Sequence, residues 1–109
     1  MPQELPIPPV AIDNPSREVI RVWLAKSKIH CVLRIGLWEE HGTDERDAWG
    51  IVLADLMRHI ADAHELEYGR DPQETLARIR STFEVEVEHP TSQRRGDFLT
   101  NRARRSDEI

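Results

Sequence analysis

Residues 28–37 alternate strictly between two kinds of side chain, and this alternation constrains the fold more than any other feature. The odd-numbered residues of this run are apolar or cysteine, whereas the even-numbered ones include all of its charged and histidine residues. A period of two predicts a half-buried β-strand. The preceding run, residues 18–26, is rich in β-branched and aromatic residues and predicts a second strand.

The two runs are separated by a short polar break, which predicts a β-hairpin. A two-residue turn at Lys26-Ser27 places the apolar residues of both strands on one face, so that register and burial agree. The turn contains neither glycine nor asparagine, which such turns prefer, and a longer loop is the alternative. The pairs expected from the two-residue turn are Leu24–Ile29, Val22–Cys31 and Ile20–Leu33.

A long helix is predicted over residues 44–68. Thr43 or Asp44 provides its N-cap, and Gly69 is a typical left-handed terminator. Apolar residues cover more than half of its circumference, which predicts a central helix. They are Trp49, Val52, Leu53, Leu56, Met57, Ile60, Ala61 and Ala63.

A second helix is predicted over residues 72–88. Asp71 and Glu74 form a capping box, and Pro72 occupies the first helical position. Its apolar stripe is narrow, so we expect this helix at the edge of the domain. The stripe consists of Leu76, Ile79, Phe83 and Val87.

The two ends of the chain differ from the middle. Four prolines between residues 6 and 15 predict an extended segment without helix over residues 1–17. This segment is interpreted as a strap over the body, with a docking peptide for a proline-binding domain as the alternative. Residues 90–109 carry a net charge of +2 and are expected to form a basic tail.

The predicted fold is therefore α+β: a single ββαα domain over residues 18–89, in which a β-hairpin packs on two antiparallel helices. A two-stranded hairpin is marginally stable alone, and it leaves two open edges. Its second face carries apolar side chains that are costly to leave in water. We therefore expect a homodimer, joined edge to edge or face to face. The residues expected in dimer or packing contacts are Val19, Trp23, Val32 and Trp49.

Asp55, His59 and Asp62 are candidate metal ligands, because helical spacing places them on one side of the first helix. A solvated flank is the preferred interpretation, since a metal site usually recruits ligands from a second element. The remaining polar candidates are read as structural. Cys31 is expected as a small core residue, His64 as a partly buried histidine with one hydrogen bond, and Glu39-Glu40-His41 as a solvated loop.

Charge and composition exclude several classes of protein. The chain has 109 residues with 20 acidic and 15 basic side chains, a net charge of −5, which disfavours nucleic acid as the default partner. One cysteine excludes an intrachain disulfide. No apolar run has the length of a membrane span and no signal peptide is evident, so we expect a soluble cytoplasmic protein.

The basic tail carries five arginines, and its expected target is the chain's own acidic body, a dimer mate or another acidic partner. Weak association with nucleic acid through this tail is the alternative. The arginines are Arg94, Arg95, Arg102, Arg104 and Arg105.

The chain resembles a family of small uncharacterised bacterial proteins, classed as a domain of unknown function. The stretches that carry the resemblance are residues 5–9, 18–23 and 48–55 followed by Arg58-His59, then residues 78–80 with Phe83, and residues 90–91 with 95–98. The likeness covers nearly everything up to Phe98. It carries over no activity, although it places Trp49, Asp55 and His59 first among residues to test.

The sequence contains no glycine-rich phosphate loop, nucleophile elbow, HExxH or Walker pattern. We therefore expect a non-enzymatic, homodimeric interaction or structural protein, without a cofactor, that could bind another protein through an acidic helix face. A metal or enzymatic site around Asp55 and His59 is the third reading.

Overall fold

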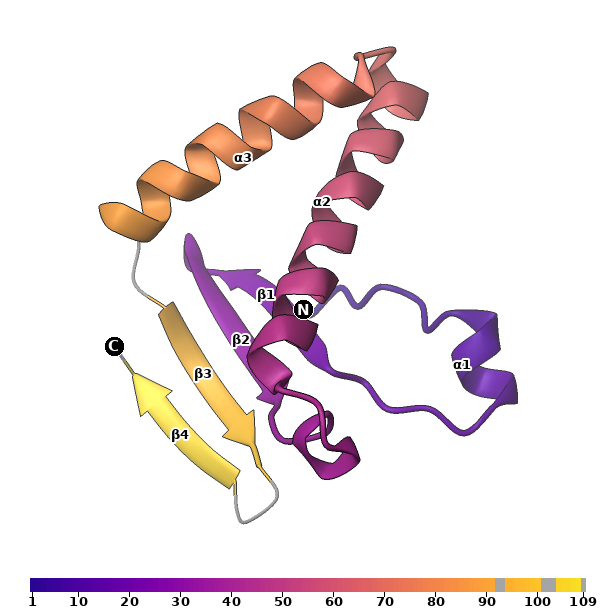
Figure 1. Ribbon diagram of the computed structural model, residues 1–109, viewed down its shortest axis with the longest axis vertical. Coiled ribbons are helices and arrows are strands. Elements are labelled where there is room, and N and C mark those ends of the chain that lie inside the picture. Colours follow the sequence, from indigo (N-terminus) through magenta and orange to yellow (C-terminus); the bar gives the residue numbers. More distant parts are fainter. Residues whose placement is uncertain (92–93, 101–103, 109) are drawn as a thin grey trace.

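The computed structural model describes residues 1–91, 94–100 and 104–108. It is an α+β structure in which a small sheet carries a long helical hairpin, as predicted (Figure 1). The elements in chain order are α1 (Pro9–Asp13), β1 (Ile20–Ala25), β2 (Lys28–Arg34), the 3-10 helix η1 (Glu39–His41), α2 (Glu45–Tyr68), α3 (Pro72–Glu88), β3 (Arg94–Leu99) and β4 (Arg104–Glu108).

The β1–β2 hairpin has the predicted register. Strand β1 pairs antiparallel with β2, and the expected pairs Leu24–Ile29, Val22–Cys31 and Ile20–Leu33 all form. The turn has two residues, as predicted, and Lys26 and Ser27 have φ angles of 52° and 60°. Two successive left-handed residues match the twist of the flanking strands, so the turn forms although it lacks glycine.

The prediction of a basic tail over residues 90–109 is wrong for the part described, which contains two strands. The sheet order is β1-β2-β3-β4; β3 lies parallel to β2, and β4 lies antiparallel to β3. Backbone pairing holds β3 although its sequence does not alternate. Gly96 lies opposite Cys31, where a Cβ would collide with the Cys31 backbone. One of the two open hairpin edges expected from the sequence, that of β2, is therefore covered.

The prediction that residues 1–17 contain no helix is wrong. Residues Pro9–Asp13 form the short helix α1, with Pro8 at its N-cap and Pro9 as its first residue. Proline is tolerated there because the first N–H groups of a helix have no partner within the helix. The remaining residues before β1 run without regular structure.

Both long helices begin and end where the sequence predicts. Asp44 caps α2 and its carboxylate accepts a hydrogen bond from the Arg46 N–H, while Gly69 ends the helix at a φ of 68°. The side chain of Asp71 accepts from the Glu74 N–H at the start of α3. After α3, the Thr91 hydroxyl and N–H both donate to Glu86, which lowers the pKa of that carboxyl and ties the helix end to the segment before β3.

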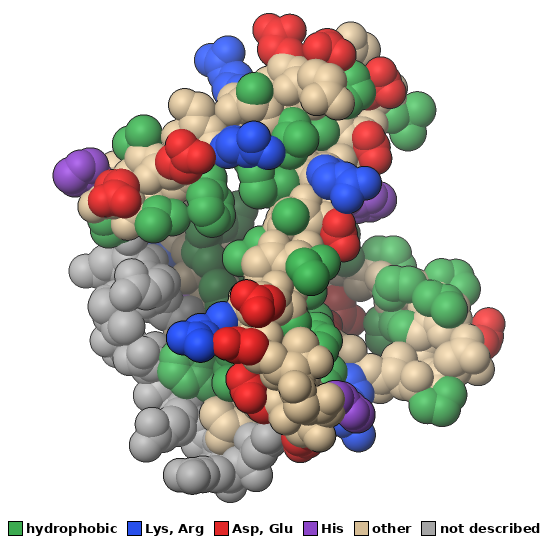
Figure 2. All heavy atoms as spheres, viewed as in Figure 1, with side chains coloured by type: hydrophobic (Ala, Val, Ile, Leu, Met, Phe, Trp, Pro, Cys, Tyr) green, Lys and Arg blue, Asp and Glu red, His purple; other side chains and the backbone are tan. Residues whose placement is uncertain are grey.

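The apolar face of the β1–β2 hairpin and the apolar arc of α2 are more exposed in the single chain than the predicted half-buried strand and central helix imply. Among the described residues, the buried apolar side chains are Ala48 and Ala61, whereas Val22 and Leu24 are 52% and 78% exposed. Figure 2 shows hydrophobic side chains gathered around an opening between the two long helices and the sheet. The radius of gyration is 15.9 Å, against about 13 Å for a compact chain of this length.

The hairpin turn provides a direct test of the register. Replacing Lys26-Ser27 by Asn-Gly (Lys26→Asn with Ser27→Gly) should raise the free energy of unfolding by about 1 kcal/mol, because both φ angles are positive and these residues adopt them at lower cost. Urea unfolding at fixed protein concentration measures the change. Ala25→Gly, in the adjoining extended strand, is the control and should lower stability instead. A fall in stability for Asn-Gly would contradict the turn.

Candidate functional site

The carboxylate of Glu45 joins the sheet to the helical hairpin. Glu45 is the first residue of α2 and is only 7% exposed. The N–H of Gly36, just after β2, lies 2.9 Å from both carboxylate oxygens of Glu45. The indole Nε1 of Trp49, one turn along the helix, donates to Oε1 of Glu45 at 3.2 Å. The end of β2 and the first turn of α2 are therefore held by one buried carboxylate.

Aromatic and acidic neighbours complete this junction. The ring of Trp38 meets the ring of Trp49 edge to face, with centroids 5.5 Å apart. The carboxylate of Glu39 accepts from the N–H of Glu45 at 3.0 Å. Residues 39–41, predicted as a solvated loop, are thus the 3-10 helix η1, and one of its side chains helps to cap α2. A hydrogen bond from the Arg46 side chain, followed by one from its backbone, lowers the pKa of the N-cap Asp44.

One face of α2 is apolar and open to solvent. Leu53, Leu56 and Ile60 are 40%, 42% and 45% exposed. With Ala63 they follow a spacing of three and four residues, which is typical of helices that pack against another helix. We call these four residues the α2 seam. They form an apolar stripe along the helix that stays partly exposed in the single chain.

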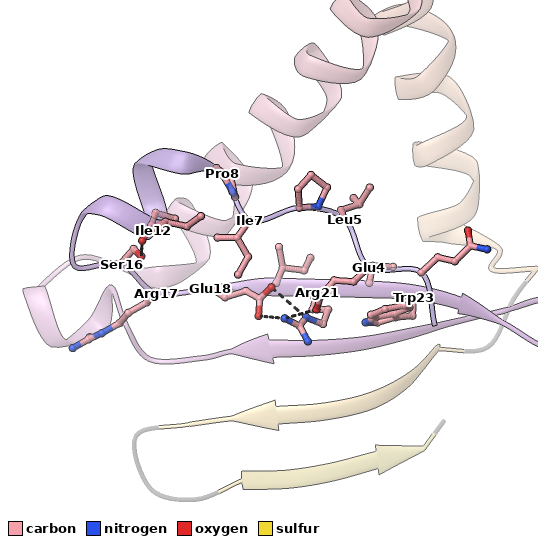
Figure 3. A pocket seen from close by; sticks show the side chains of 15 residues that line it. Glu4, Leu5, Ile7, Pro8, Ile12, Ser16, Arg17, Glu18, Arg21 and Trp23 are labelled. Atoms are coloured by element: carbon pink, nitrogen blue, oxygen red, sulfur yellow. Dashed lines mark hydrogen bonds and ion pairs between the residues drawn. The ribbon is translucent and has the colours of Figure 1, made fainter. Parts of the chain in front are cut away.

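A second apolar surface lies between the N-terminal segment and β1 (Figure 3). We call residues 3–17 the arm. The arm passes beside β1 and encloses a hollow of about 610 Å³. Its lining includes Leu5, Ile7 and Ile12 from the arm, together with Ile20, Val22 and Trp23 from β1.

Three charged residues at the rim of this hollow are paired with each other. Arg21 contacts Glu18 at 3.0 Å and Glu4 at 3.4 Å. The pair with Glu4 ties the arm to β1, and both pairs balance the charge of Arg21 within the chain. The inner surface that remains is mainly apolar.

The structure does not bring the candidate metal ligands together. Asp55, His59 and Asp62 are all exposed on α2, and Asp55 pairs with Arg58 at 3.4 Å. In the parts of the chain that are described, no three His, Cys, Asp or Glu side chains are grouped as they would be around a metal ion.

Other residues singled out from the sequence have structural surroundings. His64 is half-buried, and its Nδ1 lies 3.0 Å from Arg70 Nη1, which confirms the expectation of a partly buried histidine with one hydrogen bond. Cys31 is half-buried on β2 with a free thiol.

The predicted dimer residues lie on three elements and in the segment before β1. Trp23 lines the hollow and pairs across the hairpin with His30, while Val32 is 42% exposed. Val19 is half-buried before β1, and Trp49 belongs to the Glu45 junction. Their participation in a dimer stays a prediction.

Four of the five candidate arginines lie on the two C-terminal strands. Arg94 and Arg95 belong to β3, and Arg104 and Arg105 belong to β4. Arg102 lies outside the described residues. Their backbone positions place them in the sheet rather than in a free tail.

Sequence reasoning missed the buried role of Glu45 and the hollow under the arm. A carboxylate four residues before Trp49, at a helix start that follows a second tryptophan, is the signal that could have indicated the role of Glu45.

No helix in the described ranges combines the length and apolar character that crossing a membrane requires.

Together these features define a small α+β domain with a rigid strand-to-helix junction and two open apolar surfaces. Residues 4–91 match the family described as Domain of unknown function (DUF5076), and the chain belongs to that family. No curated protein matches the chain.

A solved structure has a similar fold. It is that of a protein described as a putative pyruvate dehydrogenase from the photosynthetic bacterium Rhodopseudomonas palustrus, which is 27% identical to this chain. The match covers 84% of this chain and 90% of the other, with a TM-score of 0.63.

The Glu45 junction predicts a large effect of one side chain on stability. Glu45→Ala leaves the Gly36 N–H and the Trp49 indole without their buried acceptor, so the free energy of unfolding should fall by about 2–4 kcal/mol. Glu45→Gln keeps one acceptor and should cost less. Thermal and urea unfolding measure both, with Glu40→Ala, an exposed neighbour, as the control that should change stability by less than about 0.5 kcal/mol. Equal effects of Glu45→Ala and Glu40→Ala would contradict the junction.

Proposed function

We propose that the chain functions as a homodimer, as a structural or interaction protein rather than an enzyme. The observation that carries this proposal is its exposed surface of 9492 Å². A compact monomer of this mass exposes about 6,200 Å². The single chain therefore presents about 3,000 Å² more surface than its mass requires.

The character of the exposed surface supports association. Contiguous apolar patches beyond a few hundred Å² are rare on monomeric proteins. Here apolar side chains are exposed on the arm, on one face of the hairpin and along the α2 seam. Examples are Leu5 at 86%, Leu24 at 78% and Ile60 at 45%.

A second copy is the occupant that we favour for these surfaces. Obligate homodimers bury roughly 2,000–5,000 Å² in total and are more apolar than transient complexes, and the surplus surface of two chains is of this order or larger. Closed two-fold dimers are also the commonest soluble oligomers. An apolar surface distributed over the whole chain is better covered by a copy of the same size than by a short peptide.

The likeness to a putative pyruvate dehydrogenase is a likeness of fold. That description belongs to the other protein and assigns no residue of this chain a step in such a reaction. The proposal here rests on the apolar surfaces alone.

Light scattering after size-exclusion chromatography tests the dimer, with an expected mass of two chains at micromolar concentration. Leu56→Asp places a charge on the α2 seam and should raise the dimer dissociation constant at least tenfold. Ile51→Asp is the matched control: the residue is 64% exposed and lies about 140° around the helix from Leu56. It should leave the mass unchanged. A wild-type mass of one chain would refute the proposal.

A further inference from the structure

The hollow between the arm and β1 is a space that the chain encloses with apolar side chains and leaves open. The arm side chains Leu5, Ile7 and Ile12 are 86%, 58% and 68% exposed although they line or border it. Figure 3 shows Ile7 pointing from the arm toward β1 across this space, while Leu5 and Ile12 lie at its border. The arm thus forms the outer wall of this hollow.

We propose that this hollow receives helix α2 of a second copy, so that the arm of each chain straps the α2 seam of the other. This inference rests on the proposed homodimer and names the surfaces that form it. The seam residues Leu53, Leu56 and Ile60 enter the space, and the arm lies over them.

The two surfaces agree in length. From Leu53 to Ile60 the seam extends about 10 Å along the helix, at 1.5 Å per residue. From Ile20 to Trp23 the wall formed by β1 extends about 10 Å, at 3.4 Å per residue. One and a half to two turns of helix therefore match the stretch of strand that lines the hollow.

The two surfaces also agree in chemistry. The ion pairs of Arg21 with Glu4 and Glu18 balance the central charges at the rim, and Arg17 points away from the hollow in Figure 3, so the surface that remains is mainly apolar. The α2 seam is uncharged over the same length. Apolar area on both sides is removed from water when they meet, at about 25 cal/mol per Å².

The amount of exposed surface requires more than one patch. A standard interface buries about 800 Å² per partner, whereas this chain exposes about 3,000 Å² beyond a compact monomer. Contact between two α2 seams alone would leave the arm and the hollow uncovered. When the arm of each chain lies over the α2 seam of the other, both surfaces are covered on both chains. This arrangement agrees with two-fold symmetry, in which every contact between two different patches occurs twice.

Cysteine cross-linking between two differently labelled chains tests the strap. In a Cys31→Ser background, Ile7→Cys and Ile60→Cys are purified separately, mixed to exchange subunits, and oxidised. We expect a disulfide-linked pair of the two variants on a non-reducing gel, at least fivefold more than for Ile7→Cys mixed with Ile51→Cys. Equal yields from the two mixtures, in a protein that still has the mass of two chains, would overturn the strap and leave the homodimer standing. A mass of one chain for the unmodified protein would refute both.

A pair of arm variants gives a second, independent readout. Ile7→Asp, inside the hollow, should raise the dimer dissociation constant at least tenfold in analytical ultracentrifugation. Val10→Asp is the matched control, since Val10 is 70% exposed on the same arm and does not line the hollow; it should change the constant by less than twofold. If Ile7→Asp leaves the dimer intact and instead releases a co-purified apolar small molecule, detected by native mass spectrometry, the hollow is a ligand site and the strap is overturned.

Discussion

The hydrogen bonds between Gly36 and Glu45 determine the shape of this chain. They fix the first turn of α2 at the end of β2, and the remainder of the helix extends beyond that anchor. A buried carboxylate is a costly anchor unless its oxygens are satisfied, and here two N–H groups satisfy it. Helix α2 is fixed at one end, α3 returns from the turn at a wide angle to it, and the far end of the helical hairpin projects beyond the sheet (Figure 1).

The open surfaces follow from this geometry. A helix packed flat on the sheet would cover the apolar face of the hairpin and its own seam together. With the helices standing out, Val22 and Leu24 on the sheet and Leu56 on α2 remain in contact with water. Each of these surfaces needs a cover of complementary length, and the arm and the seam provide one another with such a cover when two copies meet. The dimer that we propose is therefore a consequence of how the helix is anchored.

Local structure could be predicted from the sequence because local rules decide it. The hairpin register follows from alternation and turn length, and both helix starts follow from the carboxylates Asp44 and Asp71. Tertiary features were missed for different reasons. Strand β3 has no alternating pattern, since its position depends on pairing with β2 and on the missing side chain at Gly96. The helix α1 was missed because proline was read as an obstacle at a position where it is tolerated.

The candidate site was harder to predict, because amphipathic patterns indicate that a face is covered but do not name its cover. The apolar arc of α2 was read as core, although much of it is open in the single chain. Burial inside one chain and burial between two chains leave the same pattern in a sequence. Burial within one chain and burial between two chains can be told apart only when the orientations of α2 and of the arm relative to the sheet are known. These orientations depend on the buried Glu45 and on the ion pairs of Arg21.

The family match adds a last constraint on which parts of the chain the dimer needs. It covers residues 4–91, and all of the arm but its first residue, together with β1 and the α2 seam, lies within it. Strands β3 and β4, with the arginines that the sequence marked for an acidic or nucleic-acid partner, follow after its end. The surfaces that we assign to the dimer therefore belong to the domain that defines the family. The two C-terminal strands extend the sheet on the side away from β1, where they leave the arm and the hollow unobstructed.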